Sequence, residues 1–246
     1  MKVVVVMTRA PELAPAAVIT VGEAAVVRGP KTRLAPALPD PSAREALQRA
    51  FLRDVLATAR SVAGAVVRVA IAPGGNPGAF ADLGVPAGQV ITQKGDTLGD
   101  RERALFAELF RRGARQVIIV GSDIPLLEAR VLEEAFAALD ATPSPVVLGP
   151  ATDGGYYLLG LSGPDVPDLF TGVRWSTRYA LMDTLRRCEF AERRVVLLDV
   201  LDDVDQPEDL ERLREVLRDD PSRAPATAAW MEAADLKVGG HAQEGS

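Results

Sequence analysis

Short runs of β-branched and aliphatic residues alternate along this chain with longer segments of helical periodicity. The apolar runs predict buried strands at residues 3–6, 65–72, 90–92, 117–120, 146–149 and 195–200. In the segments between them, apolar side chains recur every three or four positions, which predicts helices over about 41–63, 126–139 and 178–188 and around Leu105 and Leu213. Strands that alternate with helices indicate an α/β fold with a mostly parallel sheet and helices on both faces.

The run Val117–Val120 predicts the central strand, since four consecutive β-branched residues suit a strand buried on both faces. It continues into Gly121-Ser122-Asp123, and Pro125 then prevents any extension of the strand. An acid just past the carboxyl end of a central parallel strand lies where open α/β sheets bind their ligands. Asp123 could instead only cap the helix that follows. The local sequence leaves both interpretations open.

Two segments do not follow the alternation of strands and helices. Residues 18–27 predict a small hairpin around Gly22, either an edge hairpin or a flap that covers a site. From about Asp219 the chain is rich in Asp, Pro, Ser and Ala, which predicts a poorly ordered tail with a short helix at 226–236. We therefore expect a single domain over residues 1–218, with an insertion at 12–30 and a tail at 219–246.

The composition of the 246 residues is 48% hydrophobic and 25% charged, which suits one large soluble domain. A formal net charge of −6 argues against nucleic acid or an anionic membrane as the main partner. The single cysteine, Cys188, fits a reducing compartment, and no apolar run is long enough for a signal peptide or a membrane span, so we expect a cytoplasmic protein. The only histidine, His241, falls in the predicted tail, which excludes a Ser-His-Asp triad and a histidine-rich metal site.

Two cations, Lys31 and Arg33, lie close together in a loop bounded by Gly and Pro. A lysine supplies a point charge and an arginine a planar fork, and a polyphosphate is bound well by such a pair. The loop is not a Walker A motif, because that motif requires glycine where this chain has Ala25 and Pro30. The alternative is ordinary solvated surface charge.

A second glycine-containing loop, with Gly95, Leu98, Gly99 and Arg101, leads into the helix around Leu105. Its glycines and the first-turn N–H groups of the helix could hold an anion or the edge of a nucleobase. The same residues could equally form a turn and a helix cap.

Asp153 is followed by Gly154-Gly155 between two extended runs, 146–149 and 156–160. This pattern lets a ligand approach the backbone closely, but Asp-Gly is also a strong signal for a simple hairpin corner.

The strand predicted at 195–200 is followed by several acids. Asp205 and Glu208 have the spacing of a helix capping box, whereas Asp202 and Asp203 are like charges that repel unless a cation or solvent relieves them.

These strand ends would bring together cations and carboxylates from distant parts of the chain: Lys31, Arg33, Asp123, Asp153, Asp202 and Asp203. Carboxylates bind a hard cation such as Mg²⁺, and Lys and Arg neutralise the remaining phosphate charge. The set therefore suits a metal-bridged phosphate substrate. Transfer of a phosphoryl or glycosyl group from such a substrate depends on positioning and charge neutralisation more than on a covalent nucleophile.

Five motifs occur in order along residues 1–218: Lys31-Thr32-Arg33-Leu34, Gly95-x-x-Leu98-Gly99-x-Arg101, Gly121-Ser122-Asp123-Ile124-Pro125, Gly149-Pro150-Ala151-x-Asp153-Gly154-Gly155-Tyr156-Tyr157 and Asp203-Val204-Asp205-x-Pro207-Glu208-Asp209. Together they resemble the GT-A-fold "transferase 1" family of DUF2064 proteins (rSAM/selenodomain-associated), described as glycosyltransferases or nucleotide-diphospho-sugar transferases. More distantly, the chain is similar to the molybdopterin and 2-phospholactate nucleotidyltransferases, which share the K-T-R-L element.

The resemblance implies a three-layer α/β/α GT-A fold and a divalent cofactor, Mg²⁺ or Mn²⁺. It implies that Asp123 is a catalytic, metal-bridging acid, that Asp203 is the second metal carboxylate and that Asp153 is catalytic. The residues implied to bind substrate are Lys31, Arg33, Gly95, Leu98, Gly99, Arg101, Gly154, Gly155 and Tyr156. The chain departs from the family in the segment 12–30, which separates the first strand from K-T-R-L.

The first functional hypothesis is a divalent-metal-dependent glycosyltransferase that uses a nucleotide sugar and a small-molecule acceptor. The second is a nucleotidyltransferase that moves a nucleoside monophosphate from an NTP to a small phosphorylated acceptor, which would release pyrophosphate instead of a nucleoside diphosphate. The third is a nucleotide-binding module without catalysis, whose ligand binding would need neither Asp123 nor metal.

Overall fold

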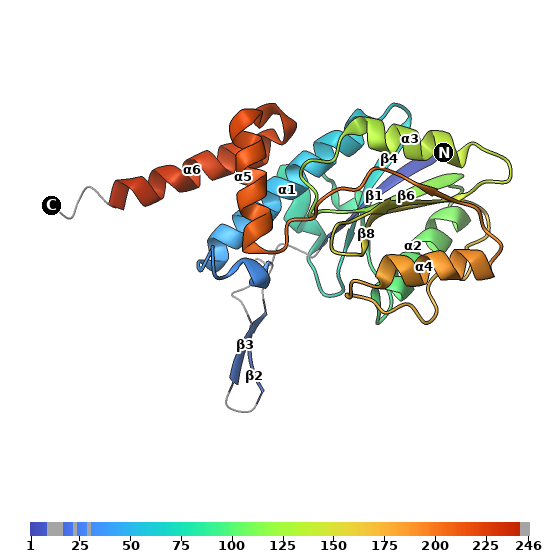
Figure 1. Ribbon diagram of the computed structural model, residues 1–246, viewed down its shortest axis with the longest axis horizontal. Coiled ribbons are helices and arrows are strands. Elements are labelled where there is room, and N and C mark those ends of the chain that lie inside the picture. Colours follow the sequence, from blue (N-terminus) through green and yellow to red (C-terminus); the bar gives the residue numbers. More distant parts are fainter. Residues whose placement is uncertain (9–16, 22–23, 29–30, 242–246) are drawn as a thin grey trace.

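The computed structural model describes residues 1–8, 17–21, 24–28 and 31–241 and is built on a seven-stranded sheet between layers of helices (Figure 1). The strands, in the order in which they lie in the sheet, are β5 (Val90–Thr92), β4 (Ala65–Ile71), β1 (Lys2–Thr8), β6 (Gln116–Gly121), β8 (Tyr156–Ser162), β7 (Val146–Pro150) and β9 (Val195–Leu197). All neighbours are parallel except β8, which runs antiparallel to both β6 and β7. The predicted α/β fold with a mostly parallel sheet is confirmed.

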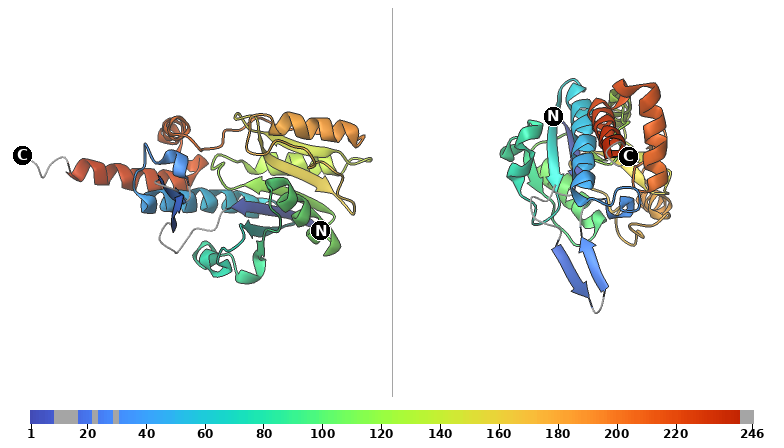
Figure 2. Two further views of the ribbon diagram at one scale, coloured as in Figure 1. Left: turned by 90° about the horizontal axis from the view of Figure 1, so that it is seen from below. Right: turned by 90° about the vertical axis from the view of Figure 1, so that its left-hand side faces the viewer.

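Helices cover both faces of this sheet (Figure 2). The helices α1 (Pro41–Ser61) and α3 (Ala129–Leu139) pack on one face, and α2 (Leu98–Arg111) and α4 (Ala180–Phe190) pack on the other. The helices α5 (Pro207–Asp219) and α6 (Pro225–His241) lie beside α1, where a third apolar cluster joins them. This arrangement is the three-layer α/β/α architecture.

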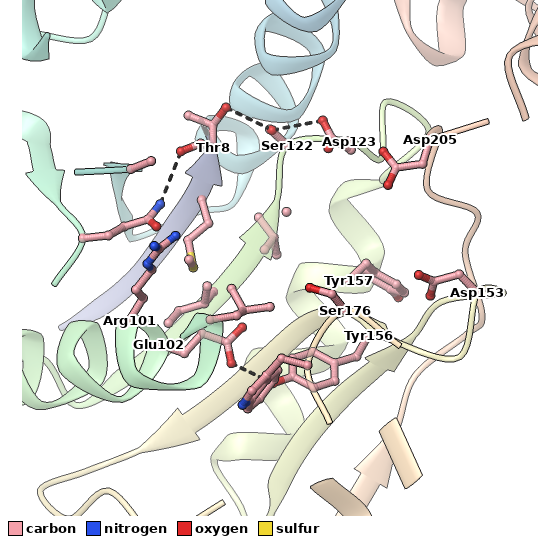
Figure 3. A pocket seen from close by; sticks show the side chains of 18 of the residues that line it. Thr8, Arg101, Glu102, Ser122, Asp123, Asp153, Tyr156, Tyr157, Ser176 and Asp205 are labelled. Atoms are coloured by element: carbon pink, nitrogen blue, oxygen red, sulfur yellow. Dashed lines mark hydrogen bonds between the residues drawn. The ribbon is translucent and has the colours of Figure 1, made fainter. Parts of the chain in front are cut away.

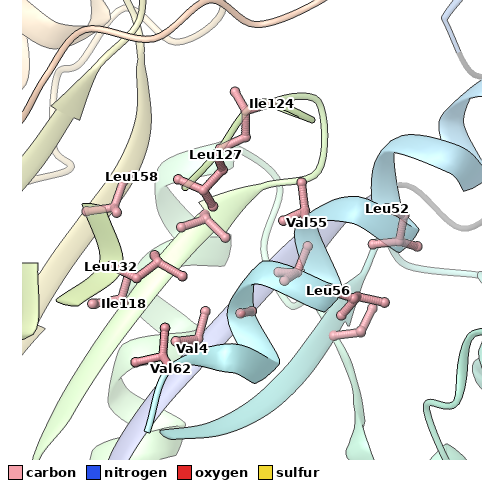
Figure 4. Packing of buried hydrophobic residues seen from close by; sticks show 14 of the residues in the cluster. Val4, Leu52, Val55, Leu56, Val62, Ile118, Ile124, Leu127, Leu132 and Leu158 are labelled. Carbon is pink, nitrogen blue, oxygen red and sulfur yellow. The ribbon is translucent and has the colours of Figure 1, made fainter. Parts of the chain in front are cut away.

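The central strand β6 is buried on both of its faces. Ile118 and Val120 belong to the cluster under α1 and α3, in which Figure 4 shows Ile118. Val117 and Ile119 belong to the cluster under α2 and α4. Successive side chains of a strand point to opposite faces, so a strand covered by helices on both sides needs apolar residues at every position. The prediction of a central strand at 117–120 is therefore confirmed.

Strand β8 begins at the end of the sheet where the neighbouring parallel strands finish. Because it runs antiparallel to β6, its first residue, Tyr156, lies at the edge of the sheet where β1 and β6 end. The hairpin corner predicted between 146–149 and 156–160 is confirmed, and β8 enters the sheet between β6 and β7.

The predicted hairpin is present as β2 (Ala17–Val21) and β3 (Ala24–Arg28), which pair antiparallel with each other and form a separate two-stranded sheet. In Figures 1 and 2 it projects from the body of the molecule. Residues 9–16, 22–23 and 29–30, including the predicted turn residue Gly22, lie outside the described residues. A role of this segment as a flap stays a prediction.

The prediction of a poorly ordered tail from residue 219 is wrong for the segment up to about residue 234. A 3-10 helix (Pro221–Arg223) follows α5, and α6 then packs on α1. The buried carboxylate of Asp54 on α1 accepts hydrogen bonds from the backbone N–H groups of Ala226 (2.9 Å) and Thr227 (2.8 Å) and from the Thr227 hydroxyl (2.6 Å). An acid far away in the sequence thus satisfies the N–H groups at the start of α6, and local composition does not reveal this contact.

None of the helices in the described part of the chain combines the length and the apolar character that crossing a membrane requires.

Candidate functional site

A pocket of about 810 Å³ opens where β1, β4, β5 and β6 end and β8 begins. Ligands of open α/β sheets bind outside the carboxyl ends of the strands, and this volume is within the usual range for small-molecule and cofactor sites. Among the side chains that line the pocket are Thr8, Lys31, Arg33, Leu98, Arg101, Glu102, Ser122, Asp123, Asp153, Tyr156, Trp175, Ser176 and Asp205. Figure 3 shows how most of these side chains surround the pocket.

Asp123 lies in the loop after β6 and is not a helix cap. The helix α3 begins only at Ala129, and its N-cap residue is Glu128. The Asp123 backbone carbonyl accepts a hydrogen bond from Val204 N–H (3.0 Å), which ties this loop to the one after β9, and the carboxylate is 38% exposed. The interpretation of Asp123 as a helix cap is therefore wrong, and its carboxylate lines the pocket.

Lys31 is buried and joins two carboxylates that are distant in the sequence. Its Nζ atom lies 3.0 Å from Asp123 Oδ2 and 2.9 Å from Asp205 Oδ1, and it donates a hydrogen bond to the Val204 carbonyl (2.5 Å). The Lys31 side chain is only 3% exposed, so the alternative of a solvated surface charge is wrong for Lys31. Arg33 is different, because its side chain is 61% exposed and only reaches toward Asp205 Oδ2 at 3.5 Å.

Burial and charge have opposite effects on the Lys31 ammonium. Burial by itself lowers the pKa of a lysine, but the adjacent carboxylates of Asp123 and Asp205 outweigh it, so the pKa of Lys31 is raised above its ordinary value. Lys31 is therefore charged at neutral pH and holds the two carboxylates together.

Two residues around the pocket adopt a backbone conformation that is uncommon outside glycine. Lys31 has φ +53° and Ser176 has φ +60°, both in the left-handed region. Such conformations cost free energy and concentrate at functional sites, where the surrounding structure holds them in place. Their position at this pocket supports its assignment as the functional site.

The acids after β9 divide into different roles. The Asp202 carboxylate accepts a hydrogen bond from the Thr152 hydroxyl (2.7 Å) and does not line the pocket. Asp203 is also outside the lining, and burial together with the nearby charges of Asp153 and Asp205 raises its pKa to about 6. Asp205 is the acid that contacts Lys31. The assignment of Asp203 to a metal stays a prediction.

The predicted capping box of Asp205 and Glu208 is wrong. The N-cap of α5 is Gln206, and the Asp209 carboxylate accepts hydrogen bonds from the backbone N–H groups of Gln206 (2.7 Å) and Asp205 (3.0 Å). Because the cap is one residue further along the chain, the Asp205 side chain takes no part in it and pairs with Lys31.

The carboxylates of Asp123 and Asp205 fit a divalent metal that arrives with a phosphate ligand. Within the described residues, no three acidic, His or Cys side chains are grouped so that they could hold a metal by themselves. Mg²⁺ is commonly bound through one or two carboxylates, with substrate phosphates and water as its other ligands. Asp123 and Asp205 already share one cation, the Lys31 ammonium, and would provide these two carboxylates.

The loop before α2 and the first turn of that helix contain two tightly packed glycines, Gly95 and Gly99, and several neighbouring residues line the pocket. Gly95 has φ +128°, and a side chain there would collide with Asp100, which forms a capping box with Thr97. Arg101 donates a hydrogen bond from Nε to the Gly95 carbonyl (3.0 Å). The interpretation as a turn and cap is thus confirmed for this loop, and Leu98 and Arg101 also line the pocket.

Asp153 has both of the roles that its sequence allowed. Its carboxylate accepts a hydrogen bond from Gly155 N–H (2.7 Å), which stabilises the corner between β7 and β8, and it also lines the pocket. Gly154 has φ +87° and lies against the Arg178 carbonyl, so a side chain there would not fit. Gly154 and Gly155 form the corner and are not part of the pocket lining, whereas Tyr156 lines the pocket.

Glu102 is a pocket residue that the motifs did not identify. It is 5% exposed, and its Oε2 accepts a hydrogen bond from the Tyr156 hydroxyl (2.7 Å). Burial raises the pKa of Glu102 to about 7, against the smaller opposite effect of the Tyr156 hydrogen bond. A signal was present in the sequence, because position 102 falls on the same helical stripe as the buried residues Leu105 and Leu109.

The raised pKa of Glu102 predicts a specific pH dependence of stability. Between the ordinary pKa of 4.5 and about 7, the folded state keeps the proton that the unfolded state has lost, so the free energy of unfolding decreases as pH rises through this window. The loss approaches about 3 kcal/mol above pH 7. In Glu102→Gln this contribution is absent. Urea unfolding of both proteins at pH 5 and pH 8 checks this, and an equal change with pH in both would contradict it.

Comparison with known proteins agrees with the fold. The sequence profile of DUF2064, described as "Uncharacterized protein conserved in bacteria", matches residues 55–177, and no curated protein matches the chain. A crystal structure from Desulfovibrio desulfuricans G20, named as a candidate nucleotide-diphospho-sugar transferase, is 27% identical with a TM-score of 0.81, over 96% of this chain and 95% of that one.

More distant structures share the fold alone. A cytidylyltransferase from Leptospira borgpetersenii serovar Hardjo-bovis has a TM-score of 0.56 at 11% identity, over 97% of this chain and 96% of that one. A CMP:2-keto-3-deoxy-manno-octonic acid synthetase complexed with CTP has a TM-score of 0.51 at 17% identity, over 89% of this chain and 99% of that one. The chain therefore belongs to the DUF2064 family of bacterial proteins and has the fold of the nucleotide-diphospho-sugar transferases.

Proposed function

We propose that this protein is a divalent-metal-dependent glycosyltransferase that moves the sugar of a nucleotide-diphospho-sugar to a small-molecule acceptor. The observation that carries the proposal is the buried Lys31 ammonium between Asp123 and Asp205 at the carboxyl end of the central strand. Transferases share this fold, and the Desulfovibrio protein of 27% identity is itself named as a candidate nucleotide-diphospho-sugar transferase.

The chemistry of the pocket suits the departure of an anionic leaving group. In the transfer, the bond from the anomeric carbon to the diphosphate oxygen breaks, and the acceptor hydroxyl forms the new bond and loses its proton. A bound Mg²⁺ or Mn²⁺ would neutralise the charge that develops on the diphosphate. Asp123 and Asp205 would orient the diphosphate through that cation, and the exposed guanidinium of Arg33, which lies 3.5 Å from Asp205 Oδ2, would bind its oxygens.

The proposed transfer does not require a covalent nucleophile, because positioning and charge neutralisation can supply the catalysis. Among the residues that the structure describes, no histidine or cysteine lines the pocket, and Cys188 is buried away from it on α4, where burial raises the pKa of its thiol to about 11. Positioning and electrostatic stabilisation are therefore the means of catalysis that these residues offer.

Nucleotidyl transfer is the second candidate, favoured by the two cations of the K-T-R-L loop. Lys31 and Arg33 both line the pocket, and a triphosphate has more charge to neutralise than a diphosphate sugar. In this reaction an acceptor oxygen attacks the α-phosphorus, and pyrophosphate leaves.

A thermal-shift panel distinguishes these candidates. It contains nucleotide sugars and nucleoside triphosphates, each with and without Mg²⁺ or Mn²⁺. A ligand that binds only the folded state at about 100 times its dissociation constant stabilises it by about 3 kcal/mol, so we expect one nucleotide sugar to raise the melting temperature, and only with metal. A shift with a triphosphate alone, and pyrophosphate release, would favour nucleotidyl transfer. If no nucleotide binds, both proposals are wrong.

A further inference from the structure

The pocket has two sides of different chemistry. Asp123, Asp205 and Asp153 lie along one side, and Glu102 and Tyr156 lie together on another (Figure 3). The first side carries the charged groups discussed above. The second side combines a buried carboxyl with aromatic rings and takes no part in binding phosphate in the proposed function.

The Glu102 carboxyl has acceptor capacity that the protein does not use. Within the described part of the chain, its hydrogen-bond partner is the Tyr156 hydroxyl, and no cation lies within ion-pair distance of it. A carboxyl has two oxygens with several lone pairs, and its burial is costly unless these are satisfied. A ligand in the pocket that donates hydroxyl groups would satisfy them.

Trp175 provides a flat apolar ring beside Tyr156, the residue that is hydrogen-bonded to Glu102. Its ring contacts Tyr156 edge to face (centroids 6.3 Å apart) and stacks with Phe170 (6.4 Å), and it is only partly buried. Its indole lies so close to Gly99 that a side chain at Gly99 would overlap it. The ring is therefore held in place from several directions, with Leu98, 40% exposed, nearby in the pocket wall.

We propose that Glu102, Tyr156 and Trp175 form a binding site for a pyranose ring. The C–H face of the ring packs on the accessible part of the Trp175 indole, which lines the pocket, and its hydroxyls donate hydrogen bonds to the Glu102 carboxyl. This inference rests on the proposed function and names the part of the pocket that receives the sugar. The ring belongs either to the donor or to a saccharide acceptor, and the two arms of the test separate these sources.

The variants are chosen to keep the fold. Glu102→Gln has nearly the same volume and still accepts the Tyr156 hydrogen bond, but it replaces one acceptor oxygen by a donor. Trp175→Leu removes the flat surface. Glu108→Gln is the matched control, because Glu108 lies on the same helix, outside the pocket, where it pairs with Lys94 and Arg112.

The first arm measures dissociation constants by calorimetry with Mg²⁺ for UDP-glucose, UDP-N-acetylglucosamine, GDP-mannose and dTDP-glucose, each against its own nucleoside diphosphate. We expect one nucleotide sugar to bind about tenfold more tightly than its diphosphate. Glu102→Gln and Trp175→Leu should reduce this ratio to about twofold or less without changing diphosphate binding, and Glu108→Gln should preserve it. A ratio that is unchanged in both pocket variants overturns the inference.

The second arm applies if no nucleotide sugar exceeds its diphosphate. It uses Trp230→Phe as background, which leaves Trp175 as the only tryptophan of the chain. D-Glucose, D-mannose and N-acetyl-D-glucosamine are titrated with and without nucleoside diphosphate, and a change in Trp175 fluorescence that disappears in Glu102→Gln assigns the ring to the acceptor. No change with any saccharide overturns the inference. Nucleotide binding that persists in that case leaves the proposed function standing, whereas saccharide binding without any nucleotide binding rejects only the proposed function.

Discussion

Replacing Asp123 by asparagine is expected to weaken metal-dependent nucleotide binding by about 100-fold, or roughly 3 kcal/mol, and to leave the fold intact. The Asp123 carboxylate is 38% exposed in the loop after the central strand. The hydrogen bond that ties this loop to Val204 is accepted by the Asp123 backbone carbonyl and not by the side chain. Asparagine keeps the shape and the backbone contact but removes the negative charge that a divalent cation requires. Calorimetric titration of the nucleotide with and without Mg²⁺ measures the effect.

Asp202→Asn is the matched control for this experiment. Asp202 is also an acid at a strand end, but it accepts a hydrogen bond from Thr152 and lies outside the pocket. It should retain the Mg²⁺ dependence. If Asp123→Asn binds the nucleotide with an unchanged response to Mg²⁺, Asp123 does not belong to the metal site.

Replacing Lys31 by methionine is expected to lower the free energy of unfolding by about 1–3 kcal/mol in the absence of metal. The methionine fills the buried space of the lysine stem but leaves Asp123 and Asp205 without the cation that holds them together. Because both carboxylates are more than a third exposed, water screens part of their repulsion, and the loss is smaller than for a fully buried pair.

The same substitution should change the response to metal. Without Lys31, Mg²⁺ alone is expected to raise the melting temperature more than it does in the native protein, because the cation then neutralises both carboxylates. Nucleotide binding in the absence of metal should fall by about tenfold. Differential scanning fluorimetry with increasing Mg²⁺ tests the first effect, and Arg33→Met, at an exposed position of the same loop, is the control. An equal response to Mg²⁺ in both variants would show that Lys31 does not neutralise this pair.

The two predictions share one physical basis. A cation must lie between Asp123 and Asp205, and the fold provides one in the form of Lys31. A divalent metal brought by a nucleotide would have to share these carboxylates with the lysine or displace it. Comparing the Lys31 and Asp123 variants separates the contribution of the protein's own cation from that of the metal.

Much of the site could be predicted from the sequence because the relevant signals are local. An apolar run such as Val117–Val120 has no stable place except a buried strand, and the residues that follow such strands meet at one edge of a parallel sheet. The motifs therefore predicted that Lys31, Arg33, Asp123 and Asp153 lie close together, and all four line one pocket.

The roles of neighbouring acids could not be predicted, because they depend on a difference of one residue. Asp203 and Asp205 both follow β9, and only the position of the α5 cap, at Gln206 with Asp209, decides that Asp205 faces Lys31. A capping motif shifted by one residue has nearly the same sequence signature but uses a different carboxylate as the cap.

The sequence by itself determined the order of strands and helices, the buried central strand and the strand ends at which the charges gather, since burial and periodicity act over a few residues. Only the tertiary structure decided which side chains meet. The contacts of Lys31 with Asp205, of Glu102 with Tyr156 and of Asp54 with the start of α6 join residues that are 174, 54 and 173 positions apart. The packing of whole elements determines such contacts, and the sequence around one partner contains no pattern that identifies the other.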